Sequence, residues 1–146
     1  MTSLQATVRA LFVKPEKGTT PVPLTSVEVT PTGFGGDHHS RRTTRRQILL
    51  ISGSVLNELD LEPGAIDENV VVDGMDVMSL TEGQQLLLGD ALVAVTFPCE
   101  PCARMDHVRH GLKNELTDRR GIFVEVVAPG AVRVGDSVEL IRNGHT

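Results

Sequence analysis

Residues 69–97 read NVVVDGMDVMSLTEGQQLLLGDALVAVTF, and this stretch decides the fold class. The runs NVVV, QQLLL and ALVAVTF are rich in valine and leucine and have the composition of β-strands. Gly74, Gly83 and the Gly89–Asp90 pair interrupt these runs, and such residues are typical of turns. The stretch therefore predicts consecutive short strands joined by turns.

The chain on either side has the same character. Residues 4–13 alternate apolar and polar side chains as a half-buried strand does, and 22–29 include a second alternating run. QILLI, GIFVEVVA and SVELIR are expected to be strands, VLNEL a short helix capped by Ser52 or Ser54, and APGAVRVGD a turn region. Residues 102–118 could hold one or two further short helices. Because the regular strand–helix alternation of a parallel sheet is missing, we predict a mainly β chain that forms a closed or sandwich-like structure.

Length and composition exclude several classes of protein. The 146 residues are enough to bury a core, and no repeat or linker divides them, so we expect a single domain over 1–146. A net charge of −5, with four Phe and no Trp or Tyr, disfavours nucleic-acid binding. No apolar run reaches the roughly 20 residues of a membrane helix, and no secretory signal is evident. With only two cysteines, the chain is expected in a reducing, cytoplasmic setting.

Both cysteines lie in the sequence FPCEPCARMD, residues 97–106. Together with His107 and His110, Cys99 and Cys102 could hold a zinc ion, although this spacing is shorter than that of common zinc fingers. A thioredoxin-like redox pair would need a helix N-terminus after a βαβ unit, which a β-rich chain does not offer. The two thiols could also be idle.

The remaining interpretation is a single reactive thiolate. Pro101 restricts the backbone directly before Cys102, and Arg104 follows two residues later. A nearby guanidinium favours the thiolate and so lowers the pKa of a cysteine, and the thiolate is the form that binds soft metals or carries sulfur. The sequence therefore favours Cys102 as the working thiol.

The loop GFGGDHHSRRTTRRQ, residues 33–47, is the most basic part of an acidic chain. Its arginines suit phosphate, and its glycines would let backbone N–H groups approach an anion. These arginines are Arg41, Arg42, Arg45 and Arg46. A solvated loop with no ligand, or an anion-binding regulatory module without thiol chemistry, would show the same pattern. Asp37 with one of the adjacent histidines could ligate a metal, and Glu68–Asn69 could either contact a ligand or simply begin a strand.

Four blocks of the sequence, taken in order, resemble the MOSC family, named after the C-terminal domain of molybdenum cofactor sulfurases. The blocks are GFGGDHH with RRQILLI, LEPGAIDENVVVDGMDVMSLTEGQQLLLGDALVAV, PCEPCARMD, and GIFVEVVAPGAVRVGDSVEL. They span roughly residues 33–140. The resemblance implies a mostly antiparallel β-barrel with a few short helices.

The resemblance also implies which residues line the functional cleft. By position, Cys102 is the family's cysteine, acting as catalytic thiol and metal ligand, and Cys99 is an auxiliary one. Asp37, His39, Arg46 and Asn69 fall on other motif positions and are expected to bind the cofactor. Arg45 is expected to help neutralise the cofactor's phosphate, and Arg104 to favour the thiolate of Cys102.

The activity implied is binding of the molybdenum cofactor, molybdopterin, with the cysteine as sulfur carrier or molybdenum ligand. Reduction of N-hydroxylated compounds is the reaction of some relatives, so the chain could be a molybdenum-dependent oxidoreductase, a sulfur carrier or transferase, or a cofactor-binding protein only. A pyridoxal-phosphate desulfurase domain does not fit in this length, so sulfur or electrons would come from a partner protein. A structural zinc-binding β domain with an interaction role remains the alternative, and the sequence does not fix an oligomeric state.

Overall fold

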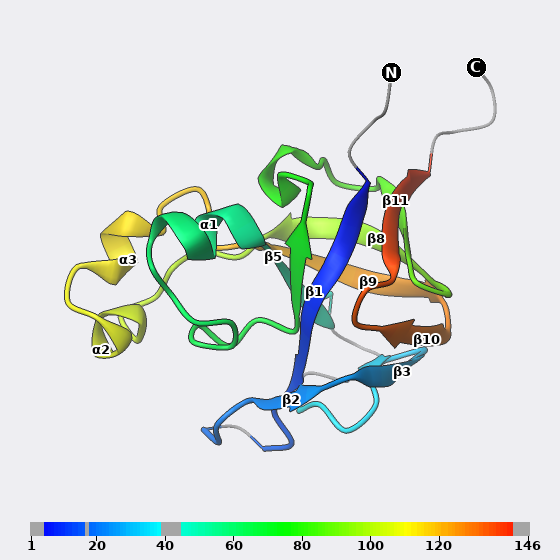
Figure 1. Ribbon diagram of the computed structural model, residues 1–146, viewed down its shortest axis with the longest axis horizontal. Helices are drawn as coiled ribbons and strands as arrows, with labels where there is room; N and C mark the ends of the chain where they lie inside the picture. The colour runs from blue at the N-terminus through cyan, green and yellow to red at the C-terminus, as the bar shows by residue number, and fades with distance from the viewer. Residues whose placement is uncertain (1–4, 17, 39–44, 142–146) are drawn as a thin grey trace.

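The structure, a computed structural model, describes residues 5–16, 18–38 and 45–141 (Figure 1). Strands dominate, and the few helices are short. The elements are β1 (Ala6–Val13), β2 (Val22–Leu24), β3 (Ser26–Thr30), β4 (Gly33–Phe34), β5 (Ile48–Ser52), α1 (Gly53–Glu58), β6 (Val70–Asp73), the 3-10 helix η1 (Val77–Ser79), β7 (Gln85–Leu88), β8 (Ala91–Pro98), α2 (Met105–Val108), α3 (Leu112–Glu115), β9 (Ile122–Ala128), β10 (Gly130–Arg133) and β11 (Ser137–Ile141).

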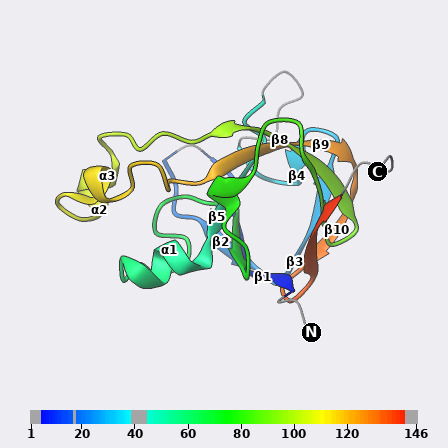
Figure 2. The ribbon, with the colours of Figure 1, turned by 90° about the horizontal axis from the view of Figure 1, so that it is seen from above.

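Seven strands close into a barrel in the order β1, β11, β7, β8, β9, β5 and β6, which returns to β1 (Figure 2). Closure depends on β11, because Val138 pairs with Leu88 of β7 on one side and with Ala6 of β1 on the other. All neighbours in the ring are antiparallel except β5 and β6, which run parallel and are joined through α1. The predicted mainly β, mostly antiparallel barrel is confirmed.

A second, three-stranded sheet in the order β10, β3, β4 packs against the barrel. Its buried residues Val29, Phe34 and Val132 join the same apolar cluster as the barrel strands. Turns were expected in APGAVRVGD at Pro129–Gly130 and at Gly135–Asp136: the chain does turn at Gly135, whereas Gly130 begins the strand β10. The alternating run within 22–29 is also divided, into β2 and β3, which pair with different strands.

The chain buries two apolar clusters, one inside the barrel and one outside it. Ile48 and Leu50 of β5 belong to the inner cluster, whereas Ile51 belongs to the outer one. Because both faces of β5 are covered, the run ILLI is apolar throughout instead of alternating. The outer cluster packs under α1, α2 and α3, which gather beside the barrel in Figure 1.

The predicted short helix over VLNEL is confirmed as α1, but its predicted cap is not. Ser52 stands at the N-cap position without a side-chain capping bond. Its hydroxyl instead accepts from the N–H of Val77 at 2.8 Å and donates to the carbonyl of Met75 at 3.1 Å, which ties η1 to β5. The two short helices expected within 102–118 are α2 and α3. None of the helices in the described ranges has the length and apolar character needed to cross a bilayer.

Candidate functional site

The cysteine loop belongs to a long excursion between two paired barrel strands. β8 ends at Pro98, which pairs with Ile122 at the start of β9, and the N–H of Cys99 donates to the carbonyl of Gly121 at 2.9 Å. Residues 99–121 therefore leave the barrel and return to the same point. This geometry places the first cysteine beside Arg120, although 21 positions separate them in the sequence.

Gly121 is required at this return point. Its φ is +123°, a backbone conformation that favours glycine. A Cβ at this position would lie 2.5 Å from the carbonyl oxygen of Leu50. The close approach of the returning chain to β5 therefore depends on the missing side chain.

A pocket of about 200 Å³ lies between this loop, the end of β1 and the turn before β6. We call it the thiol pocket. It is lined by Lys14, His38, Leu49, Asp67, Cys99, Cys102, Arg104, Met105, Arg120 and Phe123. Three side-chain cations and one carboxylate give it a net positive charge on an acidic protein, when His38 is neutral and both thiols are protonated.

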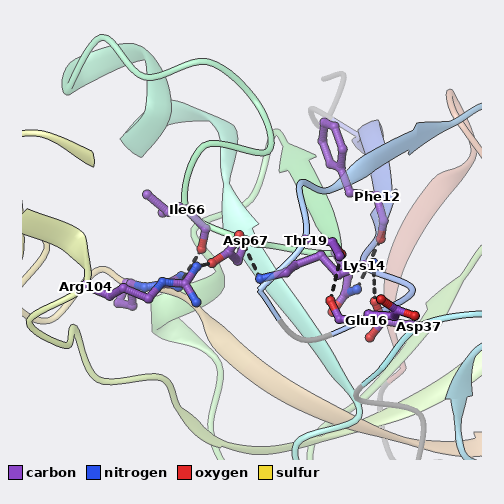
Figure 3. Close-up of polar contacts among 10 residues, drawn as sticks. Phe12, Lys14, Glu16, Thr19, Asp37, Ile66, Asp67 and Arg104 are labelled. Atoms are coloured by element: carbon purple, nitrogen blue, oxygen red, sulfur yellow. Dashed lines mark hydrogen bonds and ion pairs between the residues drawn. The ribbon is translucent and has the colours of Figure 1, made fainter. Parts of the chain in front are cut away.

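Asp67 joins two of these cations. Its carboxylate lies 3.3 Å from the Nζ of Lys14 and forms an ion pair with the guanidinium of Arg104 (Figure 3). Asp67 has a φ of +66°, an uncommon conformation for a residue with a side chain. Burial lowers the pKa of Lys14, as does the nearby Arg104, while the carboxylate of Asp37 opposes them.

Arg120 is buried, with 6% of its surface exposed against 5% for Lys14, whereas Arg104 is exposed. Its Nη2 donates to the carbonyl of Ile66 at 2.5 Å. Its Nε and Nη1 are buried and have no hydrogen-bond partner among the residues that the structure describes. Burial lowers the pKa of this guanidinium, and the strongest opposing influence is Cys99, followed by Glu68.

Glu68 lies behind Arg120 and is 1% exposed. Its Oε2 accepts from the N–H of Gly64 at 2.6 Å, while Oε1 has no partner within the described ranges. Burial raises the pKa of Glu68, and the backbone hydrogen bonds and Arg120 counteract only part of that rise.

The two thiols occupy different environments. Cys99 is half-buried and Cys102 is exposed, and neither forms a disulfide. Burial raises the pKa of Cys99, opposed first by Arg120 and then by Arg46.

Cys99 also lines a second pocket of about 330 Å³ on the other side of the loop, which we call the outer pocket. The outer pocket is lined by Met78, Pro98, Cys99, Glu100, Pro101, Thr117 and Asp118.

The two arginines of the basic loop that the structure describes, Arg45 and Arg46, differ in position. Arg46 lies over the rings of both Phe97 and Phe123, at 5.4 and 5.7 Å from their centroids. Because Phe123 lines the thiol pocket, Arg46 stands at its edge. Arg45 pairs instead with the exposed Glu82 at 2.9 Å. Arg41, Arg42 and His39 lie outside the described residues.

Asp37 and Asn69, both predicted to contact a cofactor, are buried and bound to the main chain. Asp37 Oδ1 accepts from the N–H of Lys14 at 2.7 Å. Asn69 Oδ1 accepts from the N–H of Leu49 at 2.9 Å, and its Nδ2 donates to the carbonyl of Phe12 at 3.1 Å. Both side chains therefore fix the segments that carry the pocket-lining residues, and a direct contact with a ligand stays a prediction.

Arg104 lines the thiol pocket together with Cys102, but its guanidinium is directed at Asp67, and its expected effect on the Cys102 thiolate stays a prediction. Sequence reasoning missed Lys14, Asp67 and Arg120. Asp67 adjoins the Glu68–Asn69 pair that the sequence singled out, and its role could have been suspected there. Nothing in the sequence distinguishes Arg120 from the neighbouring Arg119, because only the pairing of β8 with β9 places it at the pocket.

The zinc interpretation gains no support from this arrangement. Within residues 5–16, 18–38 and 45–141, no three side chains of His, Cys, Asp or Glu gather closely enough to hold a metal ion. That range includes Cys99, Cys102, His107 and His110, so these four do not form a zinc site.

The fold is a closed β-barrel with a cysteine loop at one side of its wall. The comparison of the sequence with family profiles identifies the family. The profile of the MOSC domain matches residues 37–139, so the chain belongs to the MOSC family. The expected family membership is confirmed. A search of curated proteins found no match to the sequence.

Solved structures show the same fold at low sequence identity. The YuaD protein of Bacillus subtilis is 22% identical, with a TM-score of 0.82 over 93% of this chain and 95% of that one. YiiM from Geobacillus stearothermophilus is 19% identical, with a TM-score of 0.78 over 96% and 77%. YiiM from Escherichia coli is 20% identical, with a TM-score of 0.67 over 94% and 70%. At these identities the likeness extends to the fold alone.

Proposed function

We propose that this protein binds the molybdenum cofactor in the thiol pocket, with Cys102 as the molybdenum ligand or sulfur carrier. The observation that carries the proposal is the convergence of two free thiols and three side-chain cations on one pocket of a MOSC domain. Thiolates are soft ligands of the kind that bind such metals, and cations suit an anionic cofactor.

The residues present fit this cofactor in their chemistry. Arg120 carries buried N–H donors without a partner in the described part of the chain, so the pocket has unused capacity for an anion. The thiol pocket alone, at about 200 Å³, is smaller than the range of roughly 300–1,000 Å³ typical of ligand sites. A cofactor larger than the thiol pocket would extend beyond it, and the outer pocket of about 330 Å³ adjoins it at Cys99.

The side chains take distinct roles in this proposal. Cys102 is exposed, so its sulfur is available to a metal or to a sulfur donor. Lys14 and Arg104, held by Asp67, provide positive charge that is fixed before the ligand arrives. Arg46 adds charge at the edge, beside Phe123. Of the other predicted cofactor contacts, Asp37 and Asn69 support these segments from behind, and His39 and Arg45 remain candidates for the phosphate.

When bound, molybdenum supplies two-electron redox chemistry or accepts sulfur, and the protein supplies ligand and electrostatics. Reduction of N-hydroxylated compounds is the activity that we propose to test first. Reduction of N-hydroxylated compounds and sulfur transfer both need a second protein, as donor of electrons or of sulfur. Two free thiols also suit a reducing compartment such as the cytoplasm.

The proposal is tested by measuring molybdenum and pterin in protein purified from a host that makes the cofactor. We expect both in the wild type, a strong loss in Cys102→Ser, and near-normal content in Cys99→Ser. Zinc analysis of the same samples tests the alternative, which predicts equal effects of the two substitutions. Wild-type protein without molybdenum or pterin, together with an unchanged Cys102→Ser variant, would remove the basis of the proposal.

A further inference from the structure

The turn before β6 presents three consecutive residues to cations of the thiol pocket. The carbonyl of Ile66 accepts from Arg120, the carboxylate of Asp67 binds Lys14 and Arg104, and Glu68 lies behind Arg120. Figure 3 shows Asp67 between the side chains of Lys14 and Arg104. Two of the three cations therefore have a carboxylate partner in the described chain.

Arg120 is the exception among these cations. It makes a single hydrogen bond, to a neutral carbonyl, and leaves Nε and Nη1 without partners in the described residues. Glu68 forms no ion pair with it within 4.0 Å among those residues, and its own Oε1 has no partner there. A buried guanidinium with unused donors is costly, since each buried polar group normally has a partner.

The surroundings of Arg120 are suited to a ligand that supplies the missing acceptors. Arg120, Cys99 and Cys102 all line the thiol pocket. The segment from Cys99 to Arg104, which carries both thiols, is irregular and mostly exposed. An anion in the pocket would therefore meet the guanidinium beside the two thiols.

We propose that Arg120 is an anion receptor that binds one tetrahedral oxyanion beside the two thiols. Nε–H shares one edge of the guanidinium with Nη2, and Nη1–H shares the other edge with Nη2, so the N–H of Nη2 that Ile66 does not use pairs with one of the two free donors and matches two oxygens of an oxyanion. The inference deepens the proposed function, because the oxyanion would be either the phosphate or the molybdenum end of the same cofactor. It also stands without that cofactor, since the receptor can be tested with simple ions.

The test compares Arg120→Gln with Arg119→Gln, an adjacent arginine that is half-buried and paired with Glu58 at 2.9 Å. Thermal unfolding is followed by circular dichroism in inorganic phosphate or molybdate, against chloride at matched ionic strength. We expect the oxyanions to raise the melting temperature of the wild type and of Arg119→Gln, but not of Arg120→Gln. Arg120→Lys should need at least about tenfold more oxyanion for the same shift in melting temperature, because lysine lacks the paired N–H donors of the guanidinium.

If Arg120→Gln does not fold, the rate of alkylation of Cys99 gives a second test of the inference. Oxyanion should slow the alkylation of Cys99 in the wild type, and in Arg120→Lys the same slowing should need about tenfold more oxyanion. No oxyanion effect in the wild type, or equal effects in the wild type and the Arg120 variants, would overturn the inference. If molybdate slows the alkylation of Cys99 in the wild type but not in Cys102→Ser, the receptor binds the molybdenum end of the cofactor. If phosphate still slows it in Cys102→Ser, the receptor binds the phosphate end.

The two proposals can fail separately. Protein that contains no pterin but shows an oxyanion effect dependent on Arg120 refutes the cofactor assignment and leaves the receptor standing. Protein that contains pterin and molybdenum but shows no such dependence refutes the receptor alone.

Discussion

Asn69 offers the sharpest test of how the barrel supports the site, because its substitution by alanine removes two buried hydrogen bonds at once. The side chain accepts from the N–H of Leu49 at 2.9 Å and donates to the carbonyl of Phe12 at 3.1 Å. It thereby joins β1, β5 and the start of β6. In Asn69→Ala both main-chain groups stay buried without these partners.

The expected loss follows from the cost of such groups. Each buried main-chain group left without a partner costs about 1–3 kcal/mol, so the free energy of unfolding should fall by about 3 kcal/mol. For a domain of this size, that loss lowers the melting temperature by roughly 6–12 °C. Since the chain has no Trp or Tyr, unfolding in urea or heat is followed by circular dichroism.

Asn57→Ala is the matched control, because the side chain of Asn57 is exposed and only accepts from Nη1 of Arg9 at 3.1 Å. We expect it to stay within about 0.5 kcal/mol of the wild type. If Asn69→Ala keeps wild-type stability while its molybdenum content per folded molecule falls, the structural role argued here is wrong. Asn69 would then be the direct ligand contact that the sequence suggested.

Three further predictions follow from the surroundings of the site. Because burial raises the pKa of Glu68, the folded state holds that proton more tightly, and stability falls as pH rises from the ordinary glutamate pKa through the folded one. Glu68→Gln should therefore gain melting temperature relative to the wild type as the pH rises above the ordinary glutamate pKa, and a constant difference would contradict this. Iodoacetamide should alkylate the exposed Cys102 before Cys99, whose pKa is raised by burial, as peptide mass spectrometry will show; the reverse order would refute this assignment. Gly121→Ala should lower the melting temperature strongly, because its Cβ would meet the carbonyl of Leu50 at 2.5 Å, and an unchanged value would mean that the chain relaxes there.

Sequence patterns predicted the elements of this fold well, because strands and turns have local signals. The valine and leucine runs of 69–97 became β6, β7 and β8, and glycines mark the turns between them. The role of Ser52 was not predictable in this way. Its hydroxyl binds η1, some 25 residues away, and the local pattern of a helix cap contains no sign of that contact.

The candidate site was predictable only where chemistry is concentrated in a few adjacent residues. Cys99, Cys102 and Arg104 are close in sequence, and all three line the thiol pocket. Lys14 and Arg120 reach the same pocket from β1 and from the end of the long excursion, through strand pairings that the sequence does not specify. Membership of the MOSC family narrows the set of reactions to consider, whereas only the structure shows which residues each cation contacts.

The most direct test of the central claim is X-ray absorption at the molybdenum edge of cofactor-loaded protein, comparing the wild type with Cys102→Ser and Cys99→Ser. If Cys102 binds the metal, Cys102→Ser should lose one sulfur neighbour of molybdenum, while Cys99→Ser should give the wild-type spectrum. Identical spectra for wild type and Cys102→Ser would contradict the claim that Cys102 is the metal ligand.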